Sequence, residues 1–104
     1  MKRFVNFKSA HNFYKYPSTH RIGTIYNKNG VIRSYSNNTI DKYNNDYSIF
    51  YYKLKNDDVK SAFKLTKNKN NNLRLFIKQK NYVLDLGLYK VSNVGYQYVK
   101  LIKI

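Results

Sequence analysis

The chain has no glutamate, no cysteine and no tryptophan, and it has one proline and four glycines among 104 residues. The absence of cysteine excludes disulfides, thiolate zinc sites and thiol catalysis. The few glycines match neither a phosphate-binding loop nor a dinucleotide fingerprint. His11 and His20 have no spacing typical of metal ligands or a catalytic dyad. We therefore expect no enzymatic activity, no cofactor, no metal and no small-molecule substrate.

Long apolar runs are also missing. The longest apolar stretch is far shorter than the segment that a membrane-spanning helix needs. No apolar region follows the basic start at Lys2 and Arg3, so the pattern is not that of a secretory signal. The sequence therefore predicts a protein that is not integral to a membrane.

Acidic residues are scarce, with five aspartates against twenty Lys and Arg, and the formal net charge is +15. So many like charges repel one another in a compact state, and a polyanionic partner relieves that repulsion. Residues with AT-rich codons (Phe, Tyr, Met, Ile, Asn, Lys) number 58, while Gly, Ala, Arg and Pro number 11. Codon bias explains why Lys exceeds Arg, but not why Glu is absent. The charge therefore indicates a nucleic-acid partner.

Apolar residues make up 42% of the chain and aromatic residues 17%, including twelve tyrosines. This content suffices for one small folded domain. Residues 1–19 contain the single proline and no clean period beyond a short strand at Arg3–Phe7. We interpret residues 1–19 as a basic, aromatic arm, irregular over Lys8–Thr19, and residues 20–104 as a single β domain.

Alternating patterns dominate that domain. Asn29-Gly30 separates two β-rich runs and predicts a hairpin, because both turn residues need positive φ. Asp57–Leu65 fits either a short helix, with Asp57 or Asp58 as its cap, or a strand, and both remain open. The pattern predicts a mainly β fold, a small antiparallel barrel or sandwich of OB or SH3-like kind, with six or seven short strands and at most one short helix. The strands are expected within His20–Lys28, Val31–Ser36, Tyr47–Lys55, Leu73–Lys80, Tyr82–Val91 and Tyr96–Ile104.

Candidate nucleic-acid contacts combine cations, which neutralise phosphates, with rings, which stack on unpaired bases. Arginines are the strongest candidates, because an AT-rich genome encodes few of them and because Lys cannot replace the bidentate hydrogen bonds of the planar guanidinium. The candidates are Arg3, Lys8, His11, Phe13, Tyr14, Lys15, Tyr16, His20, Arg21, Lys28, Arg33, Tyr35, Arg74, Lys78 and Lys80.

The composition is similar to that of proteins encoded in AT-rich organelle genomes, among which small basic chains are most often ribosomal. The sequence thus predicts a structural rRNA-binding component of a mitochondrial ribosome, in the matrix, with rRNA and neighbouring ribosomal proteins as partners. Two alternatives stay open. One is a small nucleic-acid-binding protein of an AT-rich virus or plasmid. The other is a soluble accessory subunit of a mitochondrial respiratory complex.

Overall fold

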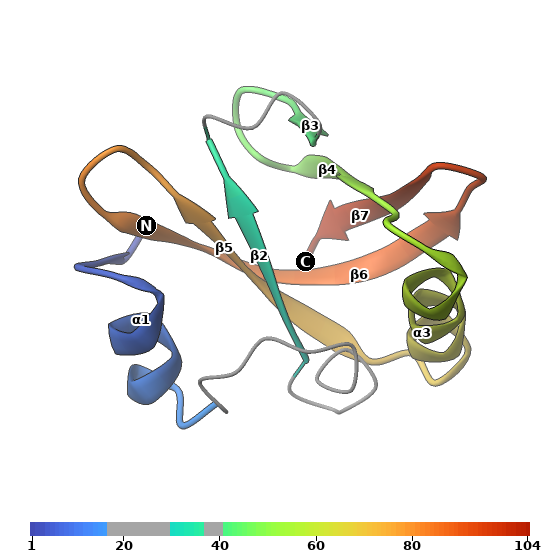
Figure 1. Cartoon of the computed structure of the whole chain (residues 1–104), viewed down its shortest axis with the longest axis horizontal. Coiled ribbons are helices and arrows are strands. Elements are labelled where there is room, and N and C mark those ends of the chain that lie inside the picture. Colours follow the sequence, from blue (N-terminus) through green and yellow to red (C-terminus); the bar gives the residue numbers. More distant parts are fainter. Residues whose placement is uncertain (17–29, 37–40) are drawn as a thin grey trace.

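The computed structural model describes residues 1–16, 30–36 and 41–104 (Figure 1). Within these residues the chain forms one mixed sheet and two helices, α1 (Phe7–Phe13) and α3 (Asp57–Asn68). The strands are β1 (Arg3–Phe4), β2 (Gly30–Tyr35), β3 (Lys42–Tyr43), β4 (Ile49–Lys53), β5 (Asn72–Lys78), β6 (Val83–Val94) and β7 (Tyr98–Lys103). The prediction of a mainly β fold is confirmed.

The sheet has the order β2-β5-β6-β7-β4-β3, and β1 pairs with β6. Short turns join β5 to β6 and β6 to β7, and these neighbours are antiparallel. In contrast, β2 lies parallel to β5, because the long connection between them, which includes α3, brings the chain back to the same end of the sheet. The prediction of a purely antiparallel sheet is therefore wrong. Two described helices instead of at most one are a second correction.

The sheet curls around its core without closing into a barrel. Ile32 of β2 and Phe50 of β4 belong to one buried cluster although three strands lie between theirs in the sheet order. Asp41 bridges the open side: its carboxylate accepts a hydrogen bond from the Ser34 hydroxyl at 2.7 Å and from the Lys53 amide at 2.8 Å. The Asp41 side chain thus connects β2 to β4 across the open side. In a closed barrel, hydrogen bonds between backbone groups would close this gap.

The segment Asp57–Leu65, which the sequence left open between helix and strand, belongs to helix α3. Asn56 caps it, with its side-chain oxygen accepting from the Val59 amide at 2.9 Å, and Asp57 and Asp58 occupy the first turn, where the helix dipole favours negative charge. Val59, Ala62, Phe63 and Thr66 are buried at helical spacing. The helix thus forms, but its cap lies one residue before the two predicted positions.

Removing the α3 cap tests this account of the helix. Asn56→Ala is expected to lower the free energy of unfolding by about 1 kcal/mol, because the Val59 amide loses its acceptor. Chemical denaturation measures this, with Asn45→Ala as control, since Asn45 is exposed and lies outside any helix. Equal stability of the two variants would show that the cap contributes nothing.

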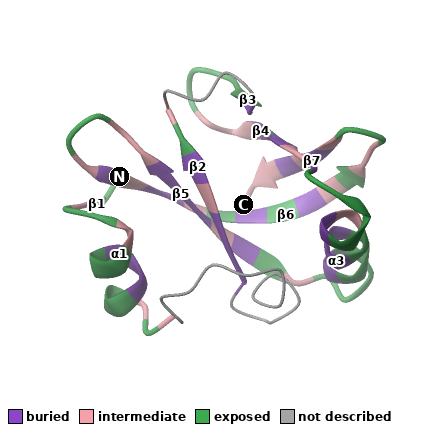
Figure 2. Ribbon diagram, in the orientation of Figure 1, coloured by how far each residue is buried: buried purple, intermediate pink, exposed green. Residues whose placement is uncertain are grey.

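The sheet carries a buried cluster on each of its two faces. Figure 2 shows buried residues along the strands and in both helices. On β2, the neighbours Val31 and Ile32 belong to different clusters, as expected when successive side chains point to opposite faces. The larger cluster includes Val59, Ala62 and Phe63 of α3, and the smaller one includes Ala10 of α1. Each helix therefore covers its own face of the sheet.

A β-bulge interrupts the alternation of β6. The pairing with β5 shifts between Leu75 and Phe76, and Gly87 has a φ of +98°, which glycine adopts without strain. Unbroken alternation over Tyr82–Val91 would place Leu86 and Leu88 on the same face, but Leu86 is buried and Leu88 is 37% exposed. Unbroken alternation in β6 is thus wrong beyond Gly87. As a result, Leu88 lies on the α1 face of the sheet.

The N-terminal segment also differs from its prediction. Residues 8–13, interpreted as part of an irregular arm, belong to α1, because Asn6 caps the helix and accepts from the Ser9 amide at 2.8 Å. For the predicted Asn29-Gly30 hairpin, Gly30 begins β2, while Asn29 and the strand expected over His20–Lys28 lie outside the described residues.

Candidate nucleic-acid interface

Helix α1 and the residues after it line the outer face of β5 and β6. Ala10 and His11 are buried against the sheet, where the His11 ring lies 5.5 Å from that of Phe76. Tyr14 stacks on Phe76 with ring centroids 6.1 Å apart. These contacts fix the direction in which the chain leaves α1, and they place Tyr16 over the sheet.

Four polar side chains form a network under this segment. Arg74 Nη1 lies 2.9 Å from both carboxylate oxygens of Asp85, and its Nε donates to the Tyr16 hydroxyl at 3.3 Å. The Tyr14 hydroxyl donates to Asp85, and the Arg74 guanidinium lies 4.0 Å from the Tyr14 ring centroid. Arg74 and Asp85 are only 16% and 5% exposed. The network therefore ties the segment after α1 to β5 and β6.

Burial, followed by the hydrogen bond to Asp85, raises the pKa of Tyr14 to about 12. Burial also raises the pKa of Tyr52 and of Tyr89 to about 12. A raised pKa means that the folded state holds the proton more tightly than the unfolded state, whose tyrosines titrate near 10. The corresponding stabilisation is complete below pH 10 and is lost as the pH rises toward 12.

An alkaline titration tests this assignment. We expect the free energy of unfolding to fall between pH 10 and 12, and Tyr14→Phe to make that fall shallower. When the same titration is followed by phenolate absorbance, Tyr14→Phe should have one tyrosine fewer in the class that ionises at the highest pH. An unchanged high-pH class in Tyr14→Phe would contradict the hydrogen bond to Asp85.

The second arginine of this face lies on β2. Arg33 Nε donates to Nε2 of His11 at 3.1 Å, and its guanidinium lies 4.9 Å from the Phe7 ring centroid. Tyr35, two residues along the strand, packs edge-on against Phe7 at 5.5 Å and stays 46% exposed. Arg33 therefore supports α1, and Arg74 supports the segment after it, through side-chain contacts that the sequence did not predict.

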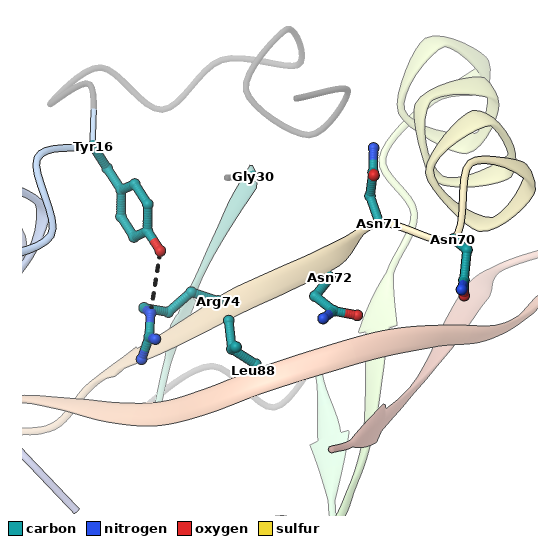
Figure 3. Close-up of a pocket in the computed structure, with 7 residues that line it drawn as sticks. All are labelled: Tyr16, Gly30, Asn70, Asn71, Asn72, Arg74 and Leu88. Carbon is teal, nitrogen blue, oxygen red and sulfur yellow. Dashed lines mark hydrogen bonds between the residues drawn. The ribbon is translucent and has the colours of Figure 1, made fainter. Parts of the chain in front are cut away.

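A hollow of about 290 Å³ opens beside this network (Figure 3). Tyr16, Arg74 and Leu88 line it together with Gly30 and the run Asn70–Asn72. Asn70 has a φ of +55°, a left-handed conformation that asparagine tolerates after a helix end. This conformation turns the chain from α3 into β5 and places residues 70–72 along the hollow. The site thus offers an aromatic ring, a guanidinium and several amide groups.

Charge on the described surface is strongly unbalanced. Arg74–Asp85 is the one ion pair in residues 1–16, 30–36 and 41–104. The other carboxylates are engaged elsewhere: Asp41 at the open side of the sheet, Asp46 at the Ser48 turn, and Asp57 and Asp58 at the start of α3. The α1 side carries Lys2, Lys8, Lys15, Arg33, Arg74 and Lys78. One carboxylate, that of Asp85, contacts this set.

The structure brings most of the predicted contact residues to the α1 side. Lys8 and Lys15 are exposed, and Phe13 is 54% exposed. Arg3 is an exception: it pairs with Leu84 on the opposite face of the sheet and lies over the Tyr82 ring at 4.4 Å. Lys78 and Lys80 border a separate hollow beside Ser36. The sequence missed Leu88, hidden by the bulge, and Asn70–Asn72, which resemble an ordinary polar loop. His20, Arg21 and Lys28 lie outside the described residues.

No helix within the described residues has the length and apolar character to cross a membrane. The same part of the chain contains no group of three or more His, Cys, Asp or Glu side chains placed to hold a metal ion.

Comparisons with known proteins place this fold beside DNA-bound structures. No family model matches the chain, and no curated protein matches it. Among solved structures, SUVH5 SRA in complex with methylated CHH DNA is similar at 26% identity and a TM-score of 0.56. Its complexes with fully methylated and hemi-methylated CG DNA are similar at TM-scores of 0.54 and 0.53, with 26% and 25% identity.

The match covers 72% of this chain in the first two cases and 71% in the third, and 63% of each SUVH5 SRA chain. It therefore spans less than two thirds of those chains. The fold of this protein is one that binds DNA in SUVH5 SRA.

Proposed function

We propose that this protein binds DNA, and that the α1 side of the sheet is its contact surface. The observation that carries the proposal is the similarity to SUVH5 SRA, whose structures contain DNA. The net charge of +15 is an independent support, because a surface with one described ion pair leaves its lysines available to phosphates.

The contact has two parts in this proposal. Exposed lysines on and after α1, such as Lys8 and Lys15, neutralise backbone phosphates without reading sequence. The hollow supplies the groups that can meet a base or sugar edge: the amides of Asn70–Asn72, the Tyr16 ring and the Arg74 guanidinium. The Asp85 carboxylate holds Arg74 in place, so its orientation is set before any ligand arrives.

A ribosomal role and a mitochondrial location remain predictions from composition, and the similar solved structures lend them no support. The respiratory-subunit alternative likewise has no structural observation in its favour. The viral or plasmid alternative is compatible with DNA binding. A comparison of binding to DNA with binding to structured RNA therefore distinguishes the proposed function from the ribosomal prediction.

The test is a pair of fluorescence-anisotropy titrations at low salt, one with a labelled DNA duplex of mixed sequence and one with a structured rRNA fragment of equal charge. We expect the duplex to bind at micromolar concentration or tighter, since non-specific DNA binding by basic proteins has Kd values of about 10⁻⁴ to 10⁻⁶ M at physiological salt and is stronger below it. Binding of the rRNA fragment more than about tenfold tighter than the duplex would favour the ribosomal prediction instead. No binding of either would overturn the proposal.

A further inference from the structure

A second groove lies on the opposite side of the molecule from α1. It is formed where β4 ends, α3 begins and the turn between β6 and β7 passes, and Figure 1 shows these parts together around α3. Its volume is about 210 Å³, and its lining includes Lys53, Lys55, Lys60, Tyr96 and Gln97. Among the residues that the structure describes, none lines both this groove and the hollow beside Arg74. None of these residues was a predicted contact.

Tyr96 stands out in this groove because 85% of its surface is exposed. The turn that carries it is nevertheless well fixed. The Gly95 amide donates to the Tyr98 carbonyl at 2.9 Å, and the Leu54 amide donates to the Gln97 carbonyl at 2.8 Å. A Cβ at Gly95 would lie 3.0 Å from the Tyr98 carbonyl oxygen, so a glycine lets the turn close this tightly. The hydrogen bonds therefore fix this turn, and the turn holds the Tyr96 ring exposed to solvent.

Lysines surround this turn. The Lys60 ammonium lies 5.4 Å from the Tyr96 ring centroid, and the Lys53 ammonium lies 5.0 Å from that of Tyr98. Lys42 approaches the same Tyr98 ring at 5.8 Å. One carboxylate, that of Asp57, also lines the groove. The described groups here are therefore several cations, one anion and an exposed ring.

We propose that this groove binds an unpaired stretch of nucleic acid, with one base stacked on Tyr96 and the flanking phosphates held by Lys53, Lys55 and Lys60. The inference rests on the proposed function, because it assumes that the chain binds nucleic acid. It goes further by assigning a second site with a different ligand form.

The exposed Tyr96 ring is the reason to propose that the bound nucleic acid is unpaired. In a duplex, each base face is covered by its neighbours, so a protruding tyrosine finds no partner there. An unpaired base offers a free face, and stacking on aromatic side chains is the usual way to hold it, together with a basic track for the backbone. The groove has both: the exposed Tyr96 ring and the lysines that line it.

The experiment uses the full chain and two labelled probes at one salt concentration: oligothymidylate of about ten nucleotides and a DNA duplex. Tyr96→Ala and Lys60→Ala are compared with two matched variants. Tyr96→Phe keeps the ring, and Lys64→Ala removes the same charge one helical turn beyond Lys60, outside the groove. Photocrosslinking with 5-iodouracil in the oligonucleotide, followed by peptide mass spectrometry, identifies the contacted ring independently of affinity.

We expect Tyr96→Ala to weaken oligothymidylate binding at least about fivefold, with duplex binding unchanged, Tyr96→Phe close to the original chain, and a crosslink at Tyr96. Lys60→Ala should weaken oligothymidylate more than Lys64→Ala does. Normal oligothymidylate binding by Tyr96→Ala, with crosslinks elsewhere, would overturn this inference while the proposed function stands. Equal losses for both probes in all lysine variants would also overturn it, as an effect of net charge alone. If the original chain binds neither probe, the proposed function fails first.

Discussion

Replacing Asp85 by alanine is expected to lower the free energy of unfolding by about 3 kcal/mol, because it leaves the half-buried Arg74 cation without its partner. Asp85 also accepts from the Tyr14 hydroxyl and from the Gly87 amide at 2.9 Å. The same change therefore removes the acceptor of the β6 bulge and one anchor of the segment after α1. A small domain has a total stability of only about 5 to 15 kcal/mol, so the loss is large.

Chemical denaturation measures the effect. Asp58→Ala is the matched control: it removes an exposed aspartate at the start of α3 and should cost less than about 1 kcal/mol. The double variant Arg74→Met with Asp85→Leu should recover part of the stability, because replacing a buried ion pair by apolar side chains is often close to neutral, while the Tyr14 hydroxyl and the Gly87 amide still lack their acceptor. Equal destabilisation by Asp85→Ala and Asp58→Ala would mean that the ion pair does not hold this face together.

Raising the salt concentration is expected to weaken DNA binding strongly. If the α1 side makes about six phosphate contacts, the logarithm of DNA affinity should fall against the logarithm of salt concentration with a slope of about −5. Affinity for duplex DNA would then drop roughly a thousandfold between about 50 and 200 mM salt. The double variant Lys8→Ala with Lys15→Ala should reduce the magnitude of the slope by nearly two, since each side chain neutralises one phosphate.

Lys64→Ala with Lys67→Ala is the control for this pair, since both lysines are exposed on α3 and the net charge falls by the same amount. Its slope should stay near that of the original chain. Tight duplex binding without salt dependence would remove the electrostatic basis of the account. Equal slope changes in the two double variants would show that no particular face makes the contact.

Local patterns in the sequence predicted most of the sheet. The alternation of Leu73, Leu75 and Ile77 with Arg74 and Phe76 matches the two faces of β5, because side-chain direction in a strand depends only on parity. Two features depend on distant parts of the chain and were out of reach. The parallel pairing of β2 with β5 joins residues about forty positions apart, and no local pattern marks it. The bulge at Gly87 changes the parity of β6 through one residue.

The candidate site was predictable only as a composition of cations and rings. Arg33 and Arg74 were expected to face a partner because arginine is scarce in this chain. In the structure Arg33 contacts His11 and Phe7, and Arg74 contacts Tyr14, Tyr16 and Asp85. Such contacts arise from α1 packing on the sheet, and residues 8–13 show no period clean enough to predict that helix. Tyr96, in contrast, was expected at the start of the last strand, whereas β7 begins at Tyr98 and Tyr96 lies in the turn before it. Nothing in its local pattern distinguished it from the eleven other tyrosines.

The measurement closest to the central claim is a titration of the isotope-labelled chain with a DNA duplex, followed by amide chemical shifts at low salt. The account predicts saturable shifts concentrated on α1, on residues 14–16 and on Asn70–Asn72 and Arg74, and their loss when salt is raised. Absence of any shift at millimolar duplex, or shifts confined to elements other than these, would contradict DNA binding through the α1 side.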